Sequence, residues 1–259
     1  MSVSAPSVSV RLDERPQGAI AYVMIDNAAK LNTLGHALMI DFVGQVEALG
    51  HRDDLRAMVL TGAGEKAFIG GANILEMAAL DAAGAEAFIT LVHRTCACLR
   101  ELPVPVIARV NGYALGAGLE VAAACDLRVA SSNAVFGMPE VKVGIPSVVE
   151  AALLPGLIGW GRTRALLLFG ENIDAATALA WGLIEQVVAP DALDTAVEAR
   201  LAALLSAGPQ AVRLQKKLIR AWEDLTLSQA VRAGIESFTQ AYATDEPARM
   251  MSGFGKRRT

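Results

Sequence analysis

Hydrophobic residues follow two spacings along the first two thirds of the chain, and these spacings predict strands and helices in turn. Two runs rich in Val and Ile, residues 7–11 and 19–25, flank a turn containing Pro and Gly and predict a β-hairpin. Residues 35–49 carry apolar side chains at helical spacing. Continuous apolar runs at residues 55–61 and 104–110 predict buried strands.

The same alternation continues between and after these segments. Further strands are expected at residues 67–71 and 127–131, and further helices at residues 73–80, 84–101 and 116–124. Because strands and helices keep alternating, we expect an α/β fold with a parallel or mostly parallel sheet and crossover helices. The recurring order is a strand, a glycine turn and a short helix.

From about residue 171 the pattern becomes mainly helical. Helices are expected at residues 174–182, 190–206, 209–222 and 226–242, separated by Gly and Pro. This region is expected to be a helical subdomain that packs on the core or serves assembly.

Composition fits a large core and argues against one class of partner. Apolar residues make up 53% of the chain and charged residues 19%, which suits a large core or a subunit that buries further surface in an oligomer. The net charge of −4 disfavours nucleic-acid binding, which normally needs a basic field. The basic cluster at residues 256–258 is typical of a solvated tail.

Cysteine usage and hydropathy predict a cytoplasmic protein. The three cysteines form no paired framework, which is typical of a reducing compartment. The first ten residues lack the pattern of a secretory signal. The longest apolar region, residues 102–125, is interrupted by Arg109 and Glu120 and is therefore not expected to span a membrane.

A glycine turn between a strand and a helix is the strongest chemical signal. The strand at residues 104–110 leads to Gly116-Ala117-Gly118, where a helix begins. Small residues let a ligand approach the backbone, and the helix start offers free N–H groups and the positive end of the dipole, so this turn can hold an oxyanion. Glu120 follows in the first helical turn. It is either a catalytic carboxylate or an ordinary acidic residue whose charge complements the helix dipole.

Two further segments carry related signals. A strand meets Gly70-Gly71 before another helix start, so the N–H of Ala72 is a candidate second donor, although the segment alone is typical of an ordinary connection. Loss of one oxyanion donor typically costs roughly 3–4 kcal/mol in the transition state. Glu140 follows a proline in an apolar loop; alone it is typical of a surface charge, but paired with Glu120 it is a candidate general acid or base.

Competing motifs are weaker. Residues 62–64 begin a loose dinucleotide fingerprint, but a strand-like segment follows where that fingerprint needs a helix. Ser147-x-x-Glu150 before an apolar run predicts a helix-capping box, which we favour over Glu150 as a third active-site carboxylate. None of the three histidines lies in a recognisable catalytic or metal-binding motif.

Together these segments resemble the crotonase family, also called the enoyl-CoA hydratase/isomerase family. The matching segments cover nearly the whole chain and comprise residues 31–34, 67–77, 105–120, 125–126, 136–140, 178–184 and 251–257. Many matches in the same order make the resemblance specific, although single ones would not.

The resemblance implies a crotonase-type spiral of repeated ββα units with a C-terminal helical trimerisation region. Residues 1–190 are expected to form the catalytic core, and residues 191–259 the helical region for oligomerisation and active-site capping. The implied assembly is a homotrimer or a homohexamer built as a dimer of trimers. The implied substrates are coenzyme A thioesters, with coenzyme A as part of the substrate, no separate cofactor, no metal, and no nucleic-acid or membrane partner.

The resemblance also implies site residues and a reaction. It places the oxyanion N–H groups at Ala72 and Ala117 and the catalytic carboxylates at Glu120 and Glu140. The residues expected to bind the substrate are Leu31, Gly70, Gly71, Ala72, Asn73, Ile74, Gly116, Ala117, Phe254 and Lys256. The implied reaction is that of an enoyl-CoA hydratase, in which Glu120 deprotonates a water that attacks C3 and Glu140 delivers a proton to C2.

Alternatives remain within and outside this activity. Isomerisation, thioester hydrolysis and retro-Claisen cleavage are other reactions of the family, and a non-catalytic RNA-binding member is a remote possibility. Isomerases commonly lack an acid at the position of Glu120, so the pair of glutamates favours hydration.

Three departures from the family pattern bear on the substrate: Asn73 replaces a common Asp, Ala117 replaces a frequent Gly, and residues 145–150 replace the usual Pro-Gly-Ala-Gly-Gly. The stiffer last segment leads to the hypothesis of an unusual acyl group.

Overall fold

A large, mostly parallel sheet forms the centre of the chain. The computed structural model describes residues 5–252, and in it six strands pair in the order β1-β2-β3-β5-β7-β10. These strands are β1 (Ser7–Arg15), β2 (Gly18–Asp26), β3 (Leu55–Gly62), β5 (Val106–Val110), β7 (Leu127–Ser131) and β10 (Gln186–Val188). Only β1 and β2 pair antiparallel, as the predicted hairpin, and the other neighbours pair parallel. The predicted sheet type is confirmed.

A second sheet of very short strands lies beside the first. Its strands, in order, are β4 (Ala67–Ile69), β6 (Tyr113–Leu115), β8 (Val135–Gly137) and β9 (Asn172–Asp174). The first three follow β3, β5 and β7 along the chain, so a long strand and a short strand alternate before each helical segment. This is the expected repeat of ββα units. The sequence did not predict β6, β8, β9 or β10, because three residues carry no readable alternation.

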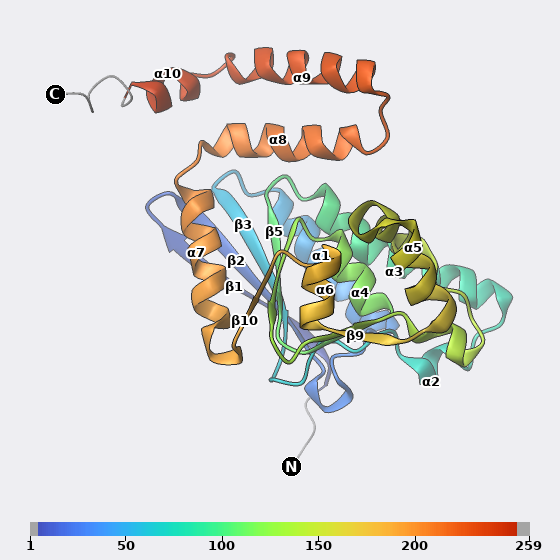
Figure 1. The fold of residues 1–259 in the computed structure, drawn as a ribbon. Coiled ribbons are helices and arrows are strands. Elements are labelled where there is room, and N and C mark those ends of the chain that lie inside the picture. The colour runs from blue at the N-terminus through green and yellow to red at the C-terminus, as the bar shows by residue number, and fades with distance from the viewer. Residues whose placement is uncertain (1–4, 253–259) are drawn as a thin grey trace.

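Helices cover both faces of the large sheet (Figure 1). One face carries α1 (His36–Gly50), α3 (Ala82–Glu101) and α4 (Ala117–Ala124), and the other carries α7 (Leu193–Leu205). Apolar side chains of α7 pack against Ile20 and Val59 of the sheet in a buried cluster separate from the main core. The predicted division of the chain at residue 190 stays a prediction. Helix α7 follows that boundary, and yet it covers one face of the large sheet.

The remaining helices lie around and beyond this core. They are η1 (Ala28–Lys30), α2 (Ile74–Met77), η2 (Pro139–Val143), η3 (Val149–Leu153), α5 (Leu154–Phe169), α6 (Ala175–Trp181), η4 (Pro190–Ala192), α8 (Pro209–Trp222), α9 (Leu227–Ala241) and α10 (Glu246–Met251). The helix predicted at residues 73–80 is a single turn, and α5 was not predicted because Gly159, at φ 77°, interrupts its helical pattern. In Figure 1, α8 lies between the core and α9.

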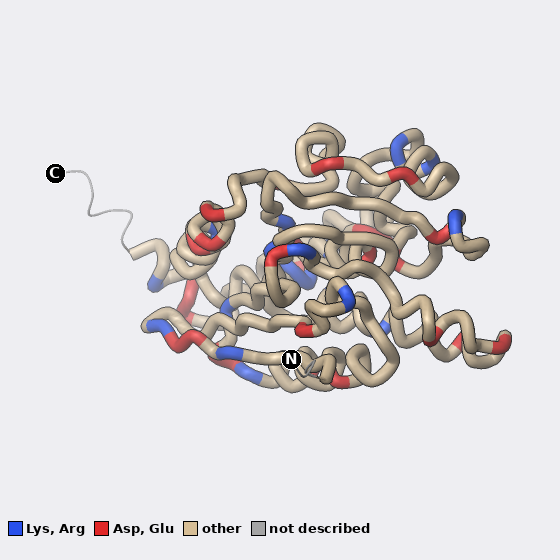
Figure 2. Tube along the Cα trace, turned by 90° about the horizontal axis from the view of Figure 1, so that it is seen from below, with Lys and Arg blue, Asp and Glu red and all other residues tan. Residues whose placement is uncertain are grey.

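Two surface features bear on the predicted partners: the distribution of charge and the length of the helices. In the view of Figure 2, acidic and basic residues are interspersed along the trace and no basic face is seen. Within residues 5–252, none of the helices combines the length and the apolar character needed to cross a membrane.

Candidate active site

The start of α4 presents a free backbone N–H at the end of a glycine turn. Gly116 adopts φ 52° and ψ −123°, a conformation that favours glycine, and its N–H donates to the carbonyl of Gly137 at 2.9 Å. Ala117 is the first helical residue, so its N–H has no partner within the helix. Within the described part of the chain, no acceptor is found for this N–H. The methyl group of Ala117 is buried and leaves the amide in place.

The turn after β4 presents a second free N–H. Ala72 forms an isolated parallel bridge with Leu34, but the two hydrogen bonds of that bridge involve its neighbours. The N–H of Leu34 donates to Gly71 at 2.9 Å, and the N–H of Asn73 donates to Leu34 at 2.8 Å. The bridge therefore leaves the N–H of Ala72 unused, and residues 5–252 supply no other acceptor for it.

Glycines bring these two turns together. A Cβ on Gly118 would lie 2.0 Å from the carbonyl oxygen of Ile69, so α4 starts in direct contact with the end of β4. A Cβ on Gly71 would lie 3.2 Å from the carbonyl oxygen of Leu115. Two amide donors on adjacent turns, each without an internal acceptor, are the arrangement that an oxyanion hole requires.

Glu120 lies in the first turn of α4, as predicted, and its side chain is buried. It is 4% exposed, and its Oε1 accepts a hydrogen bond from the N–H of Ala151 at 3.3 Å. Burial, followed by the nearby negative charge of Glu140, raises the pKa of Glu120 to about 8. The influence of Glu140 places the two carboxyl groups within electrostatic reach of each other. Glu120 can therefore exchange a proton near neutral pH, as a general acid or base must.

Glu140 reaches the same place from η2. Its Oε1 lies against the glycine turn, because a Cβ on Gly116 would lie 2.3 Å from that oxygen. Its Oε2 accepts a hydrogen bond from the hydroxyl of Ser147 at 2.8 Å. One oxygen is thus fixed by Ser147, and the other faces the turn that carries the Ala117 N–H.

The segment after Glu140 corrects one prediction. Ser147 and Glu150 form no capping box: η3 begins after Val148, no side chain caps it, and Ser147 bonds Glu140 instead. Glu150 is 7% exposed, and its Oε1 lies 2.7 Å from Nδ1 of His93 on α3. The capping pattern fails because the chain turns sharply at Val149, whose φ of 40° costs a β-branched residue on the order of 1–3 kcal/mol.

Comparison with known proteins gives this geometry its context. The sequence model of the family described as enoyl-CoA hydratase/isomerase matches residues 15–259. The chain is 36% identical over 246 residues to a short-chain-enoyl-CoA hydratase of Clostridium acetobutylicum, covering 93% of each chain.

The chain belongs to the enoyl-CoA hydratase/isomerase family.

Other relatives agree along nearly the whole length. A crotonyl-CoA hydratase of Syntrophomonas wolfei is 33% identical over 240 residues, covering 92% of each chain. The crystal structure of an enoyl-CoA hydratase from Bacillus anthracis superposes with a TM-score of 0.90 at 29% identity, covering 96% of this chain and 97% of that one. The predicted membership of the crotonase family and its α/β fold are therefore confirmed, whereas the role of the C-terminal helices in trimerisation stays a prediction.

The enoyl-CoA hydratase/isomerase family member described here places most of its predicted substrate-binding residues around the same two turns. The N–H of Gly70 donates to the carbonyl of Leu31 at 2.8 Å, which holds the 31–34 segment against the glycine turn. Asn73 caps α2 by accepting from the N–H of Leu75 at 3.1 Å, and Ile74 is 60% exposed beside it. Phe254 and Lys256 lie outside the described residues, so their predicted contacts with coenzyme A stay predictions, as do the roles of the other site residues.

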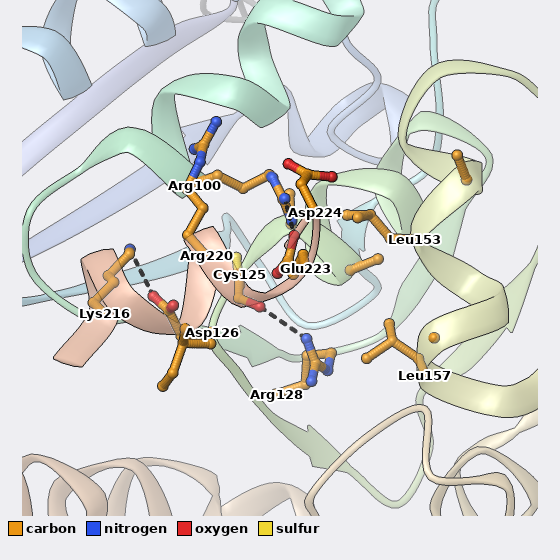
Figure 3. A pocket seen from close by; sticks show the side chains of 15 residues that line it. Arg100, Cys125, Asp126, Arg128, Leu153, Leu157, Lys216, Arg220, Glu223 and Asp224 are labelled. Atoms are coloured by element: carbon orange, nitrogen blue, oxygen red, sulfur yellow. Dashed lines mark hydrogen bonds and ion pairs between the residues drawn. The ribbon is translucent and has the colours of Figure 1, made fainter. Parts of the chain in front are cut away.

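A cavity of about 580 Å³ lies elsewhere in this family member and takes in none of the predicted site residues. It is lined by residues of α3, α4, α5 and α8 (Figure 3). Lys216 of α8 is buried at its edge and donates to Asp126 at 2.7 Å and to the carbonyls of Leu99 and Val104. This cavity lies where α8 packs on the core, and neither Glu120 nor Glu140 lines it.

Sequence reasoning missed three side chains around the glutamates. Ser147 and Glu150 were assigned to a cap, and His93 stood in no motif. The departure from the usual glycine-rich segment at residues 145–150 was the signal that pointed to this region. Their partners, however, are set by the tertiary fold: His93 and Glu150 are 57 residues apart in the chain.

Proposed function

We propose that this chain is an enoyl-CoA hydratase, which adds water across the 2,3 double bond of a 2-enoyl-CoA to give a 3-hydroxyacyl-CoA. One observation carries the proposal: two carboxyl groups, Glu120 and Glu140, stand together beside the glycine turn that ends in the free N–H of Ala117. The relatives named as short-chain-enoyl-CoA hydratase and crotonyl-CoA hydratase support the same reaction.

The first step polarises the substrate. The N–H groups of Ala72 and Ala117 donate to the thioester oxygen, which draws electrons from the C2–C3 double bond and makes C3 electrophilic. The ionised form of Glu120 removes a proton from a water as the oxygen of that water bonds to C3. A general base is most effective when its pKa lies near the working pH, and burial brings Glu120 into that range.

The second step returns a proton. The electrons of the double bond rest on the thioester oxygen as an enolate, and Glu140 delivers a proton to C2 as the enolate collapses. Ser147 fixes one oxygen of Glu140 and leaves the other, against Gly116, for this transfer. The proton held by Glu120 then passes through water to Glu140, which restores both groups.

The proposal includes assembly as a homotrimer or a dimer of trimers. Leu227, Val231, Ile235 and Phe238 form an apolar stripe along α9, and each is more than half exposed. Residues three and four apart share one face of a helix, so this stripe supports contact with another subunit.

The reaction is tested with a panel of thioesters followed by mass spectrometry. Crotonyl-CoA incubated in water enriched in ¹⁸O is expected to gain one labelled water, with the label at C3. If a 3-enoyl-CoA is converted to its 2-enoyl isomer and neither compound is hydrated, the activity is isomerisation and the proposed hydration is wrong. Release of free coenzyme A would indicate thioester hydrolysis instead. Single Glu120→Gln and Glu140→Gln variants that both hydrate crotonyl-CoA at the wild-type rate would refute the assigned roles.

A further inference from the structure

A buried carboxylate beside Glu120 has no part in the steps above. Glu150 is 7% exposed, and its Oε1 is held by His93 at 2.7 Å. Its Oε2 is buried and has no hydrogen-bond partner among residues 5–252. A buried acceptor without a partner is costly, so a role outside simple packing is indicated.

The turn that carries Glu150 also touches Glu120. The next residue, Ala151, shares its N–H between the carbonyl of Val148 at 2.9 Å and Oε1 of Glu120 at 3.3 Å, and the bond to Glu120 favours the ionised carboxylate. The negative charge of Glu150 acts in the opposite direction and, after burial and Glu140, contributes to the raised pKa of Glu120. One short turn therefore applies two opposed influences to the same carboxyl group.

The backbone conformation of this turn is strained. Val149 has φ 40° although it is β-branched, and such a conformation persists only where the surroundings hold it. The contacts that follow it are the pair of Glu150 with His93 and the bond from Ala151 to Glu120. They join η3 to α3 on one side and to α4 on the other.

We propose that Glu150, fixed by His93, is a positioning residue that holds η3 on Glu120 and controls the protonation of that carboxyl group. The catalytic part of this inference rests on the proposed hydratase function. Glu150 does not need to touch the substrate: it acts through its charge and through the placement of the Ala151 N–H.

On the elements around Glu150, His93 is the group that holds it by a hydrogen bond. Helix α3 also presents the buried thiol of Cys96, whereas its Arg94 and Arg100 pair with Glu47 and Glu223. Helix α4 presents Glu120, and the nearby η2 presents Glu140 and Lys142, of which the Lys142 side chain lies against Gly170.

Helix α5 supplies no competing cation. Arg162 donates to the carbonyl of Trp181 at 2.9 Å, and Arg164 lies over the ring of Trp160 at 5.5 Å. Changes at Glu150 and His93 are therefore expected to act on Glu120 in opposite directions.

The test measures the titration of Glu120 in two ways. The first is the acid limb of kcat/KM for crotonyl-CoA hydration. The second needs no substrate: it is the pH dependence of unfolding, taken as the difference between each protein and the same protein carrying Glu120→Gln. Glu150→Gln keeps an acceptor for His93 but removes the charge, so both midpoints are expected to move to lower pH.

Companion variants separate charge from packing. His93→Ala removes the hydrogen bond to Oε1 of Glu150 and leaves that negative charge less compensated, so the midpoints are expected to move to higher pH. Glu150→Asp keeps the charge but shortens the side chain, so the midpoints stay in place while kcat falls about tenfold. Glu86→Gln removes an exposed carboxylate on the same helix as His93 and serves as the control for net charge.

The outcomes are decisive in each case. Midpoints that are unchanged in both Glu150→Gln and His93→Ala overturn the proposal. If Glu150→Gln does not fold, His93→Ala tests the proposal alone. A shift of its midpoints to higher pH supports the proposal, and a shift to lower pH or no shift overturns it. If the wild-type protein hydrates no thioester and yet the unfolding midpoints move as expected, the hydratase function fails while the control of Glu120 by Glu150 stands.

Discussion

Replacing Glu120 by Gln is expected to stabilise the protein increasingly as the pH rises, while it removes activity. Glu120 is 4% exposed, and burial raises its pKa from 4.5 to about 8. The folded protein therefore keeps a proton that the unfolded chain releases. The stability associated with the neutral carboxyl is complete below the unfolded pKa and is lost as the pH rises through the folded pKa.

The size of the effect follows from the separation of the two pKa values. One pKa unit corresponds to about 1.4 kcal/mol, and the separation of about 3.5 units corresponds to about 5 kcal/mol in total. Between pH 5 and pH 7, the gain of Glu120→Gln over the wild type is expected to grow by about 2 to 3 kcal/mol. A further increase of about 1 kcal/mol is expected up to pH 9, where the folded group has also ionised.

The assay is urea unfolding of both proteins at fixed protein concentration across this pH range, because the proposed assembly would make stability depend on concentration. The change with pH is the informative quantity, since any cost of placing an amide in the site is the same at every pH. Glu65→Gln, which removes an exposed carboxylate, is the control and is expected to stay within about 0.5 kcal/mol of the wild type throughout. A difference between Glu120→Gln and wild type that does not change from pH 5 to pH 9 would refute the argument that burial keeps Glu120 protonated.

Three further changes test other parts of the structure. Gly118→Ala places a Cβ 2.0 Å from the carbonyl oxygen of Ile69 and is expected to lower the unfolding free energy by about 3 kcal/mol and to abolish hydration. In the control Gly156→Ala the added Cβ meets nothing within 4 Å, so the unfolding free energy is expected to equal that of the wild type or to exceed it by up to about 1 kcal/mol. Ser147→Ala removes the hydrogen bond to Glu140 and is expected to lower kcat about tenfold with little change in KM; a changed KM with normal kcat would instead assign Ser147 to substrate binding. Ile235→Glu places a charge on the apolar stripe of α9 and is expected to reduce the mass found by light scattering, while Glu236→Gln on the same helix is expected to leave the mass unchanged.

The sequence predicted those elements whose side-chain pattern is set by the element itself. Strands such as β2 and β3 are long enough for their apolar pattern to be read, and α1 repeats its buried side chains at helical spacing. The strands β6, β8 and β9 of the second sheet are too short for this, and only β4 was predicted. Helix α5 contains Gly156, Gly159 and Gly161, so its stability comes from packing on the core and its own pattern gives little sign of it.

The candidate site divides in the same way. The glycine turn before Ala117 is a local feature, because a free N–H at a helix start follows from a few adjacent residues. The environment of the Ala72 N–H also depends on the bridge with Leu34, which is distant in the chain. Glu120 was predictable from its place in that first turn. The partners of Glu140 and Glu150 were not, because the Ser-x-x-Glu pattern describes a cap equally well and only the backbone at Val149 decides between the two.

The strained turn at Val149 falls in the segment where the family resemblance led us to expect a glycine-rich sequence. Glycine would adopt a φ of 40° without strain but would leave the following residues free to move, whereas a valine held in that conformation is fixed by its surroundings. Here those surroundings are two contacts, of which Glu150 makes one with His93 and Ala151 makes the other with Glu120, the proposed general base. The two contacts therefore supply the rigidity that glycine gives up, and the placement of Glu120 is expected to depend on them.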